Sequence, residues 1–297
     1  MQKPPALRKG DTIAIVATAR KAVKEELEFA INLAEEWGLH VILGKSIGAE
    51  EHQFGGDDAL RASDFQQQLN NPEVKAIWCA RGGYGTVRII DEIDFTAFIK
   101  NPKWIIGYSD ITVLHSHIHN LGIQTLHGQM PVDIENKSEA ARESLRKILF
   151  EEEYNIQFLA DNKLNKAGEA EGILVGGNLS MLYSMCGSPS AIETKNKILF
   201  IEDLDEYLYH VDRMMQNLKR NGYFDSIKAL LVGGMTEMND NAIPFGYNAQ
   251  QIISQYIQDK EIPLVFDFPA GHISNNLALP FGRKVQICLK NQEFTLQ

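Results

Sequence analysis

The chain has 297 residues, of which 44% are hydrophobic and 23% charged, and its 29 basic and 39 acidic residues give a formal net charge of −10. This composition is typical of a folded globular protein and excludes a disordered or collagen-like chain. The negative charge argues against a nucleic-acid partner, and no apolar run approaches the ~20 residues of a membrane span. The length favours two domains of about 150 residues each.

The N-terminal half alternates short apolar segments with amphipathic ones. Near-continuous apolar strands separated by helices are typical of a parallel sheet that is covered by helices on both faces. We predict strands at residues 12–17, 40–43, 74–80, 104–108 and 124–127. We predict helices at residues 23–37, 59–69, 86–93, 111–120 and 138–149.

A polar segment at residues 134–166, with three consecutive glutamates, is predicted to link an N-terminal domain (1–133) to a C-terminal domain (167–297). In the C-terminal domain we predict strands at 172–175, 197–201, 229–232, 264–267 and 285–289 and helices at 179–186, 211–220 and 248–258. Some of these strands should pair antiparallel towards the C-terminus. The predicted fold class is therefore α/β, with an N-terminal parallel-sheet domain and a C-terminal mixed α/β domain.

The N-terminus and the cysteines indicate the cellular compartment. The apolar run at residues 13–17 is too short for a signal peptide, and Arg20 and Lys21 follow it closely, so we interpret it as a buried strand. The chain has three cysteines, an odd number, and they are widely spaced: Cys79, Cys186 and Cys288. This pattern does not fit a disulfide framework. We expect a cytoplasmic protein.

Ser109 lies where an apolar strand turns into an amphipathic helix, in the segment Gly-Tyr-Ser-Asp-Ile-Thr at residues 107–112. A sharp strand-to-helix turn of this kind exposes the nucleophile of G-x-S-x-G hydrolases, although Ile111 stands where the second glycine would be. Backbone N–H groups at the start of the helix can stabilise an oxyanion. The alternative is that Ser109 only caps the helix.

A serine nucleophile needs a base. His272 lies in a polar, glycine-containing loop after a predicted strand, which is where open α/β folds bind ligands. The alternative is a loop histidine that only hydrogen-bonds its asparagine neighbours. His115 and His119 share a helix face, but no third ligand has suitable spacing, so we expect no metal site.

The base also needs an orienting carboxylate, and Glu202 at the end of a predicted strand is the first choice. Asp203, Asp205 and Asp212 lie close to it in the sequence. Spacing alone does not separate Glu202 from Asp203, and the whole group could be a solvated acidic loop.

Two glycine-rich turns follow predicted strands. Arg-Gly-Gly-Tyr-Gly at residues 81–85 could bring backbone N–H groups to an anion, but it lacks the endings of the common nucleotide-binding loops. Gly-Gly-Asn-Leu-Ser at residues 176–180 places Asn178 either as a helix cap or as an amide facing a substrate. Each segment could also be no more than a tight turn.

Together, and in this order, these motifs resemble the LD-carboxypeptidase family of serine peptidases, which includes muramoyl-tetrapeptide carboxypeptidases and microcin C self-immunity peptidases. The resemblance rests on residues 81–85, 107–112, 176–180, Ile-Glu-Asp at 201–203, Tyr-x-x-Asp-Arg-Met at 209–214, Gly-His at 271–272 and Leu-Pro-Phe-Gly at 279–282. It spans nearly the whole chain.

The resemblance implies roles for individual residues. Ser109 would be the nucleophile, His272 the general base and Glu202 its orienting partner. The backbone N–H groups of Gly83 and Asp110 would form the oxyanion hole. The charge and position of Arg81 suggest contact with a substrate carboxylate, and Asn178 is a second candidate for substrate contact.

The resemblance also implies a reaction and an assembly. The reaction would be hydrolysis of the bond between an L-centre and the C-terminal D-alanine of cytoplasmic murein tetrapeptide, by a homodimer without metal or organic cofactor. One alternative substrate is a peptidyl- or aminoacyl-nucleotide, as in the microcin branch. The segment between Glu202 and His272 contains no tryptophan to stack on a base, which favours murein peptide. A second alternative is a non-catalytic binding protein with the same fold.

Overall fold

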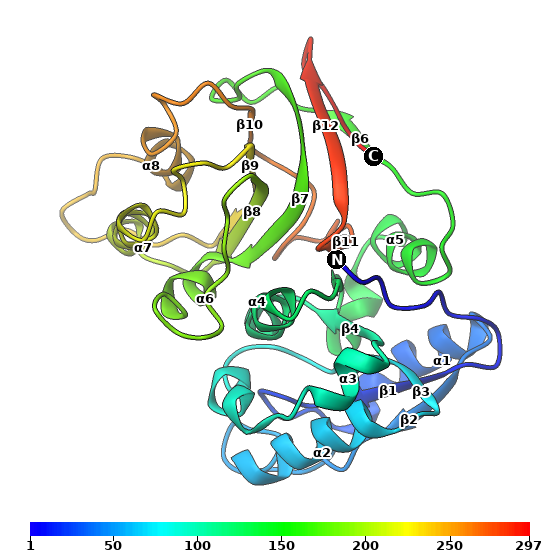
Figure 1. Ribbon diagram of the computed structural model, residues 1–297. Coiled ribbons are helices and arrows are strands. Elements are labelled where there is room, and N and C mark those ends of the chain that lie inside the picture. The colour runs from blue at the N-terminus through cyan, green and yellow to red at the C-terminus, as the bar shows by residue number, and fades with distance from the viewer. The chain divides into compact units, whose positions relative to one another are not determined.

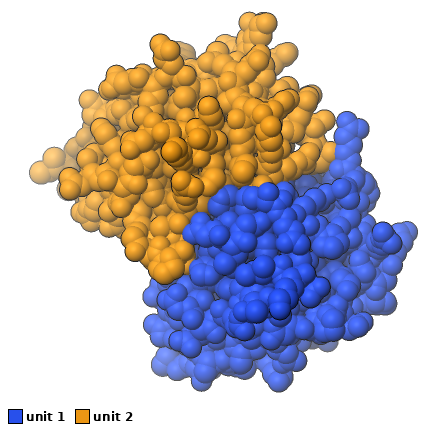
Figure 2. Space-filling model, in the orientation of Figure 1, with its two compact units in different colours: residues 1–153, 274–280 blue, residues 154–273, 281–297 orange.

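The computed structural model describes residues 1–297, and these form two compact units, coloured separately in Figure 2. Unit 1 comprises residues 1–153 and 274–280, and unit 2 comprises residues 154–273 and 281–297. Two sheets, one of six and one of seven strands, form their frameworks. The predicted two-domain α/β fold, with a mostly parallel first sheet and a mixed second sheet, is confirmed.

The six-stranded sheet has the order β11-β5-β4-β3-β1-β2, and its pairs from β2 to β5 are parallel. Its strands are β1 (Thr12–Val16), β2 (His40–Leu43), β3 (Val74–Cys79), β4 (Trp104–Gly107), β5 (Thr125–His127) and β11 (Leu279–Phe281). The chain moves from β1 outward to β2 and then returns past β1 to β3. This reversal makes the carboxyl ends of β1 and β3 a topological switch point, where α/β sheets bind ligands.

Helices α1 to α4 of unit 1 connect successive strands from β1 to β5, and α5 follows β5 (Figure 1). They are α1 (Glu28–Glu36), α2 (Asp58–Asn70), α3 (Thr96–Lys100), α4 (Thr112–Asn120) and α5 (Glu139–Leu149), with 3-10 turns η1 (Lys24–Leu27), η2 (Thr86–Arg88), η3 (Ile90–Glu92), η4 (Ser109–Ile111) and η5 (Pro131–Asn136). The helix predicted at residues 86–93 is therefore the pair of short turns η2 and η3.

The seven-stranded sheet has the order β10-β9-β8-β7-β12-β13-β6. Strands β7 to β10 pair parallel, whereas β12 and β13 add an antiparallel half. The strands are β6 (Ile156–Leu159), β7 (Gly168–Asn178), β8 (Lys197–Leu204), β9 (Ala229–Thr236), β10 (Leu264–Val265), β12 (Lys284–Lys290) and β13 (Glu293–Leu296). The helices are α6 (Leu179–Ser184), α7 (Leu208–Arg220) and α8 (Ala249–Gln255).

The segment predicted as a linker, residues 134–166, is largely structured. It contains the end of η5, helix α5 and strand β6. Helix α5 buries Ala141, Leu145 and Leu149 at helical spacing, which anchors it to unit 1. No helix in the structure combines the length and the apolar composition that crossing a bilayer requires.

Candidate active site

Ser109 occupies a strained backbone position directly after β4. Its φ is +63°, in the left-handed region that side chains other than glycine rarely adopt. Nine non-glycine residues have positive φ, and Ser109 is the only buried one, since the other eight are exposed. The N-cap residue of the turn η4 is Tyr108, so helix capping does not account for the strained backbone of Ser109. A buried, strained serine at a strand-to-helix turn fits a nucleophile elbow.

The glycine-rich loop after β3 lies against this serine. A Cβ built on Gly82 would come 3.2 Å from the Ser109 Cβ, 3.3 Å from its Oγ and 3.4 Å from the backbone N of Asp110. The Gly82 carbonyl accepts from the Arg20 backbone N–H at 3.4 Å. Because the peptide unit is planar and trans, the next N–H, that of Gly83, points in the opposite direction. Unit 1 thus brings the segments of the two expected oxyanion donors, Gly83 and Asp110, together.

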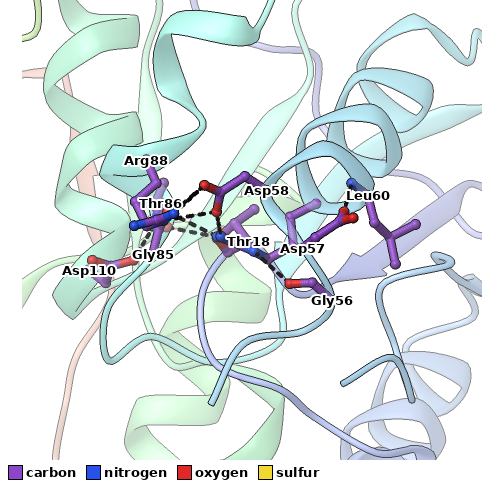
Figure 3. A network of polar contacts seen from close by, with 10 residues as sticks. Thr18, Gly56, Asp57, Asp58, Leu60, Gly85, Thr86, Arg88 and Asp110 are labelled. Carbon is purple, nitrogen blue, oxygen red and sulfur yellow. Dashed lines mark hydrogen bonds and ion pairs between the residues drawn. The ribbon is translucent and has the colours of Figure 1, made fainter. Parts of the chain in front are cut away.

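The carboxylate of Asp110 fastens the serine turn to the glycine loop. It accepts the Thr86 backbone N–H at 2.9 Å, and Figure 3 shows this contact beside Gly85. Asp110 is 1% exposed, and this burial raises the pKa of its carboxyl. The two loops are therefore held together by a buried polar contact, not by apolar packing alone.

The buried side chain of Arg61 also binds the glycine-rich loop, at Gly85. It is 1% exposed on helix α2, and its guanidinium donates to the carbonyl oxygens of Thr18 (2.6 Å) and Gly85 (3.0 Å). The carboxylate of Asp58 binds Arg61 and also Arg88, and Figure 3 shows Asp58 beside Arg88. These contacts tie the glycine-rich loop beside Ser109 to helix α2 and to the loop after β1.

Sequence reasoning did not single out Arg61, although a signal was present. Arg61, Phe65 and Leu69 follow the i, i+4, i+8 spacing of the buried helix face, and all three are buried. An arginine on such a face must have polar partners inside the protein. That requirement points to a buried network even before the partners are known.

In unit 2, Glu202 and His272 form a close pair. Glu202 Oε2 lies 2.6 Å from His272 Nδ1 and also accepts the His272 backbone N–H at 3.1 Å. The Glu202 side chain is fully buried and that of His272 is 14% exposed. Since a carboxylate can only accept, Nδ1 carries the proton and the imidazole lone pair is on Nε2. This is the tautomer that a general base requires.

The local backbone explains how the pair forms. Strand β8 extends to Leu204, beyond the predicted end at residue 201, so Glu202 lies within the sheet. The pairing of β8 with β9 shifts register between Ile201 and Asp203, and such irregularities often redirect side chains near active sites. Gly271 has φ +102°, and a Cβ there would come 2.7 Å from Glu202 Oε2. Only glycine lets the histidine loop approach this closely.

Asp203, the alternative orienting residue, has other partners. Its carboxylate accepts from the Asn178 amide (2.8 Å) and from the backbone N–H groups of Ser180 and Leu204 (both 2.9 Å). Burial and the neighbouring Glu202 carboxylate raise the pKa of Asp203 to about 7. Asn178 in turn caps α6 through Met181 and is 3% exposed. The structure therefore gives Asn178 the capping position that the sequence left open, and its contact with substrate stays a prediction.

Arg81 begins the glycine loop of unit 1. Its guanidinium donates to the carbonyl oxygen of Lys21 at 3.3 Å and lies 3.4 Å from the carboxylate of Glu26. The side chain is partly exposed. Its predicted contact with a substrate carboxylate would compete with Glu26.

His115 supports the serine turn from within unit 1. Its Nε2–H donates to the carbonyl oxygen of Gly107, two residues before Ser109, at 2.9 Å, and its Nδ1 lies 2.8 Å from the Thr125 hydroxyl. Complete burial lowers the pKa of His115 to about 4. The imidazole is therefore neutral at physiological pH. It links Gly107 to Thr125 by hydrogen bonds and is not a candidate for the catalytic base.

We expect this histidine to make the protein acid-sensitive. The folded pKa lies below the unfolded value of about 6.5, so the unfolded chain binds the proton first as pH falls. The stabilisation is complete above pH 6.5 and should decline by about 3 kcal/mol as pH falls to 4. Chemical unfolding at several pH values should show a smaller decline in His115→Gln than in His40→Gln, where the replaced histidine is exposed.

The pKa of His115 can also be read directly from its imidazole resonance by NMR titration. A value near 6.5 in the folded protein, or equal acid sensitivity in the two variants, would contradict the prediction.

The N-terminal and C-terminal parts of the chain both match known proteins of one family. Residues 13–128 match the family model of the LD-carboxypeptidase N-terminal domain, and residues 171–287 match that of the C-terminal domain. A probable murein peptide carboxypeptidase of Bacillus subtilis is 38% identical, over 95% of this chain and 90% of that protein. The microcin C7 self-immunity protein MccF of Escherichia coli is 28% identical, over 97% and 93%. The crystal structure of a muramoyltetrapeptide carboxypeptidase from Oxalobacter formigenes superposes with a TM-score of 0.87 at 28% identity, covering 96% of this chain and 97% of that chain.

Proposed function

Because the chain belongs to the LD-carboxypeptidase family of serine-type hydrolases, we propose that it releases the C-terminal D-alanine from murein tetrapeptide. The observation that carries the proposal is the backbone of Ser109, a strained and buried serine in contact with a glycine loop. The Glu202–His272 pair supplies a base with the correct tautomer. Relatives named as murein peptide carboxypeptidases support the substrate class.

In the proposed mechanism the Ser109 hydroxyl attacks the carbonyl carbon of the bond to D-alanine, and His272 Nε2 accepts its proton. The oxyanion binds the backbone N–H groups of Gly83 and Asp110, each such donor being worth about 3 kcal/mol. His272 then protonates the leaving amine, which leaves an acyl-enzyme on Ser109. Water activated by His272 hydrolyses this ester, and Glu202 stabilises the imidazolium in both steps.

The proposal also requires His272 of unit 2 to reach Ser109 of unit 1. Arg81 and Asn178 remain proposed substrate contacts. Assembly as a homodimer and a cytoplasmic location likewise remain predictions.

A nucleotide-conjugated peptide is the second candidate substrate, as suggested by the relative named for microcin C7 immunity. The three tryptophans, Trp37, Trp78 and Trp104, all lie in unit 1, so unit 2 offers no indole for a base. Tyr207 and Tyr209 are the alternative stacking surface, because their rings lie 5.7 Å apart and are 44% and 40% exposed as residues. The absence of tryptophan from unit 2 favours the murein peptide.

The test is to incubate the purified protein with murein tetrapeptide and, separately, with a peptidyl-nucleotide conjugate. We expect D-alanine to be released from the tetrapeptide and the conjugate to remain intact, as measured by chromatography of the products. Cleavage of the conjugate alone would favour the immunity function. Binding of either compound without cleavage would favour a non-catalytic protein.

A further inference from the structure

Arg20 lies in the loop after β1 and covers Gly83. A Cβ built on Gly83 would come 2.6 Å from Arg20 Cδ and 2.7 Å from its Nε. The Arg20 backbone N–H also donates to the Gly82 carbonyl oxygen. A guanidinium therefore lies directly beside the glycine whose N–H is the proposed oxyanion donor, and any side chain at position 83 would displace it.

Arg20 differs from the basic residues around it in having no acidic partner. Lys21 pairs with Glu50 at 2.5 Å, and Arg81 with Glu26 at 3.4 Å. Arg20 is exposed and forms no ion pair. A guanidinium presents a planar set of donors that matches a carboxylate in a bidentate manner. Among Arg20, Lys21 and Arg81, Arg20 is thus the one that has no acidic partner and is available for an external carboxylate.

A carboxypeptidase cleaves the last peptide bond of its substrate, so the substrate's C-terminal carboxylate must lie close to the oxyanion hole. The C-terminal carboxylate carbon of the substrate is three covalent bonds from the scissile carbonyl carbon, at about 1.3–1.5 Å per bond. A group that recognises it must therefore be a near neighbour of the oxyanion hole. The loops that carry Arg20 and Gly83 follow β1 and β3, the two strands that flank the topological switch point of this sheet.

We propose that Arg20 binds the C-terminal carboxylate of the peptide substrate and thereby makes the enzyme an exopeptidase. This inference rests on the proposed function and adds a specificity-determining residue to it. An internal peptide bond, or a blocked C-terminus, would offer Arg20 no negative charge.

The experiment compares kcat/KM for a tetrapeptide ending in D-alanine with that for the same peptide ending in D-alanine amide. We expect the wild-type protein to prefer the free acid by about 100-fold, the range of a charge-assisted contact. Arg20→Met should lower the value for the acid about 100-fold and leave the value for the amide within about threefold. Lys21→Met removes a neighbouring charge that is already paired with Glu50, so it should keep the wild-type preference.

Three outcomes bear differently on the inference. Retention of the preference for the acid in Arg20→Met would overturn it, and so would loss of that preference in Arg81→Met in its place. Failure of the wild-type protein to cleave either peptide would refute the proposed function itself. Because Arg20 is exposed, we expect its variant to melt at the wild-type temperature, which circular dichroism can check.

Discussion

We expect the Ser109→Ala variant to lose D-alanine release by a factor on the order of 10⁶, the effect of removing the nucleophile from a triad that works as a unit. The melting temperature should change little, because the change removes one hydroxyl from a side chain that does not cap the helix. Turnover of the tetrapeptide and thermal unfolding, measured on the same preparations, check both parts.

Two further variants separate catalysis from structure. Ser109→Gly should be equally inactive but about 1 kcal/mol more stable than Ser109→Ala, because glycine adopts φ +63° without strain. Ser116→Ala removes another buried serine, on α4, whose Oγ has no hydrogen-bond partner, and should leave activity intact. A structural role for Ser109 would instead appear as a large loss of stability, with activity per folded molecule retained.

Glu202→Gln should lower kcat by about 10⁴-fold, as expected when the orienting carboxylate of a triad is neutralised. A glutamine carries no charge, so it cannot stabilise the imidazolium even when its oxygen takes the place of Oε2 and accepts from the His272 backbone N–H and Nδ1–H. The opposite orientation would place the NH₂ group at Nδ1, force the proton to Nε2 and remove the base. Glu202 Oε1 is buried without a hydrogen-bond partner, so either orientation of the amide also leaves a buried group unsatisfied. Kinetics across the pH range of the reaction would measure the loss.

Asp203→Asn is the matched control for this change. It also replaces a buried carboxyl group on β8 with an amide, but Asp203 contacts Asn178 and the start of α6, not the histidine. We expect activity per folded molecule within tenfold of wild type. Equal damage from the two substitutions would show that Glu202 is not the orienting residue.

The parallel sheet could be predicted from the sequence because its strands, apart from the edge strand β2, are short apolar runs whose residues are mostly buried. The strand predicted at residues 12–17 is β1 (Thr12–Val16), with four of its five residues buried. The helix predicted at residues 86–93 is wrong, although Ile89, Ile90 and Ile93 are spaced as on a helix. Distant groups fix that segment: the Asp110 carboxylate binds Thr86, and Arg61 binds Gly85. The spacing of hydrophobic residues within a short segment carries no information about contacts with residues far away in the sequence.

The choice between Glu202 and Asp203 shows a second limit. Adjacent residues of a strand point to opposite faces, so one of the two had to face away from any given histidine. Which one meets His272 depends on the register shift between β8 and β9 and on the close approach of Gly271. Both are long-range features of the backbone, and neither follows from composition or spacing.

The return of the chain at residues 274–280 has a consequence for biosynthesis. Strand β11 forms an edge of the N-terminal sheet, and β12 and β13 lie between β7 and β6 in the other. A ribosome must therefore translate past residue 281 before the first sheet gains β11, and past residue 296 before β13 joins β12 to β6 in the second. A nascent peptidase of this design stays unfinished, with an open sheet edge at β5, almost until translation has passed its last strand.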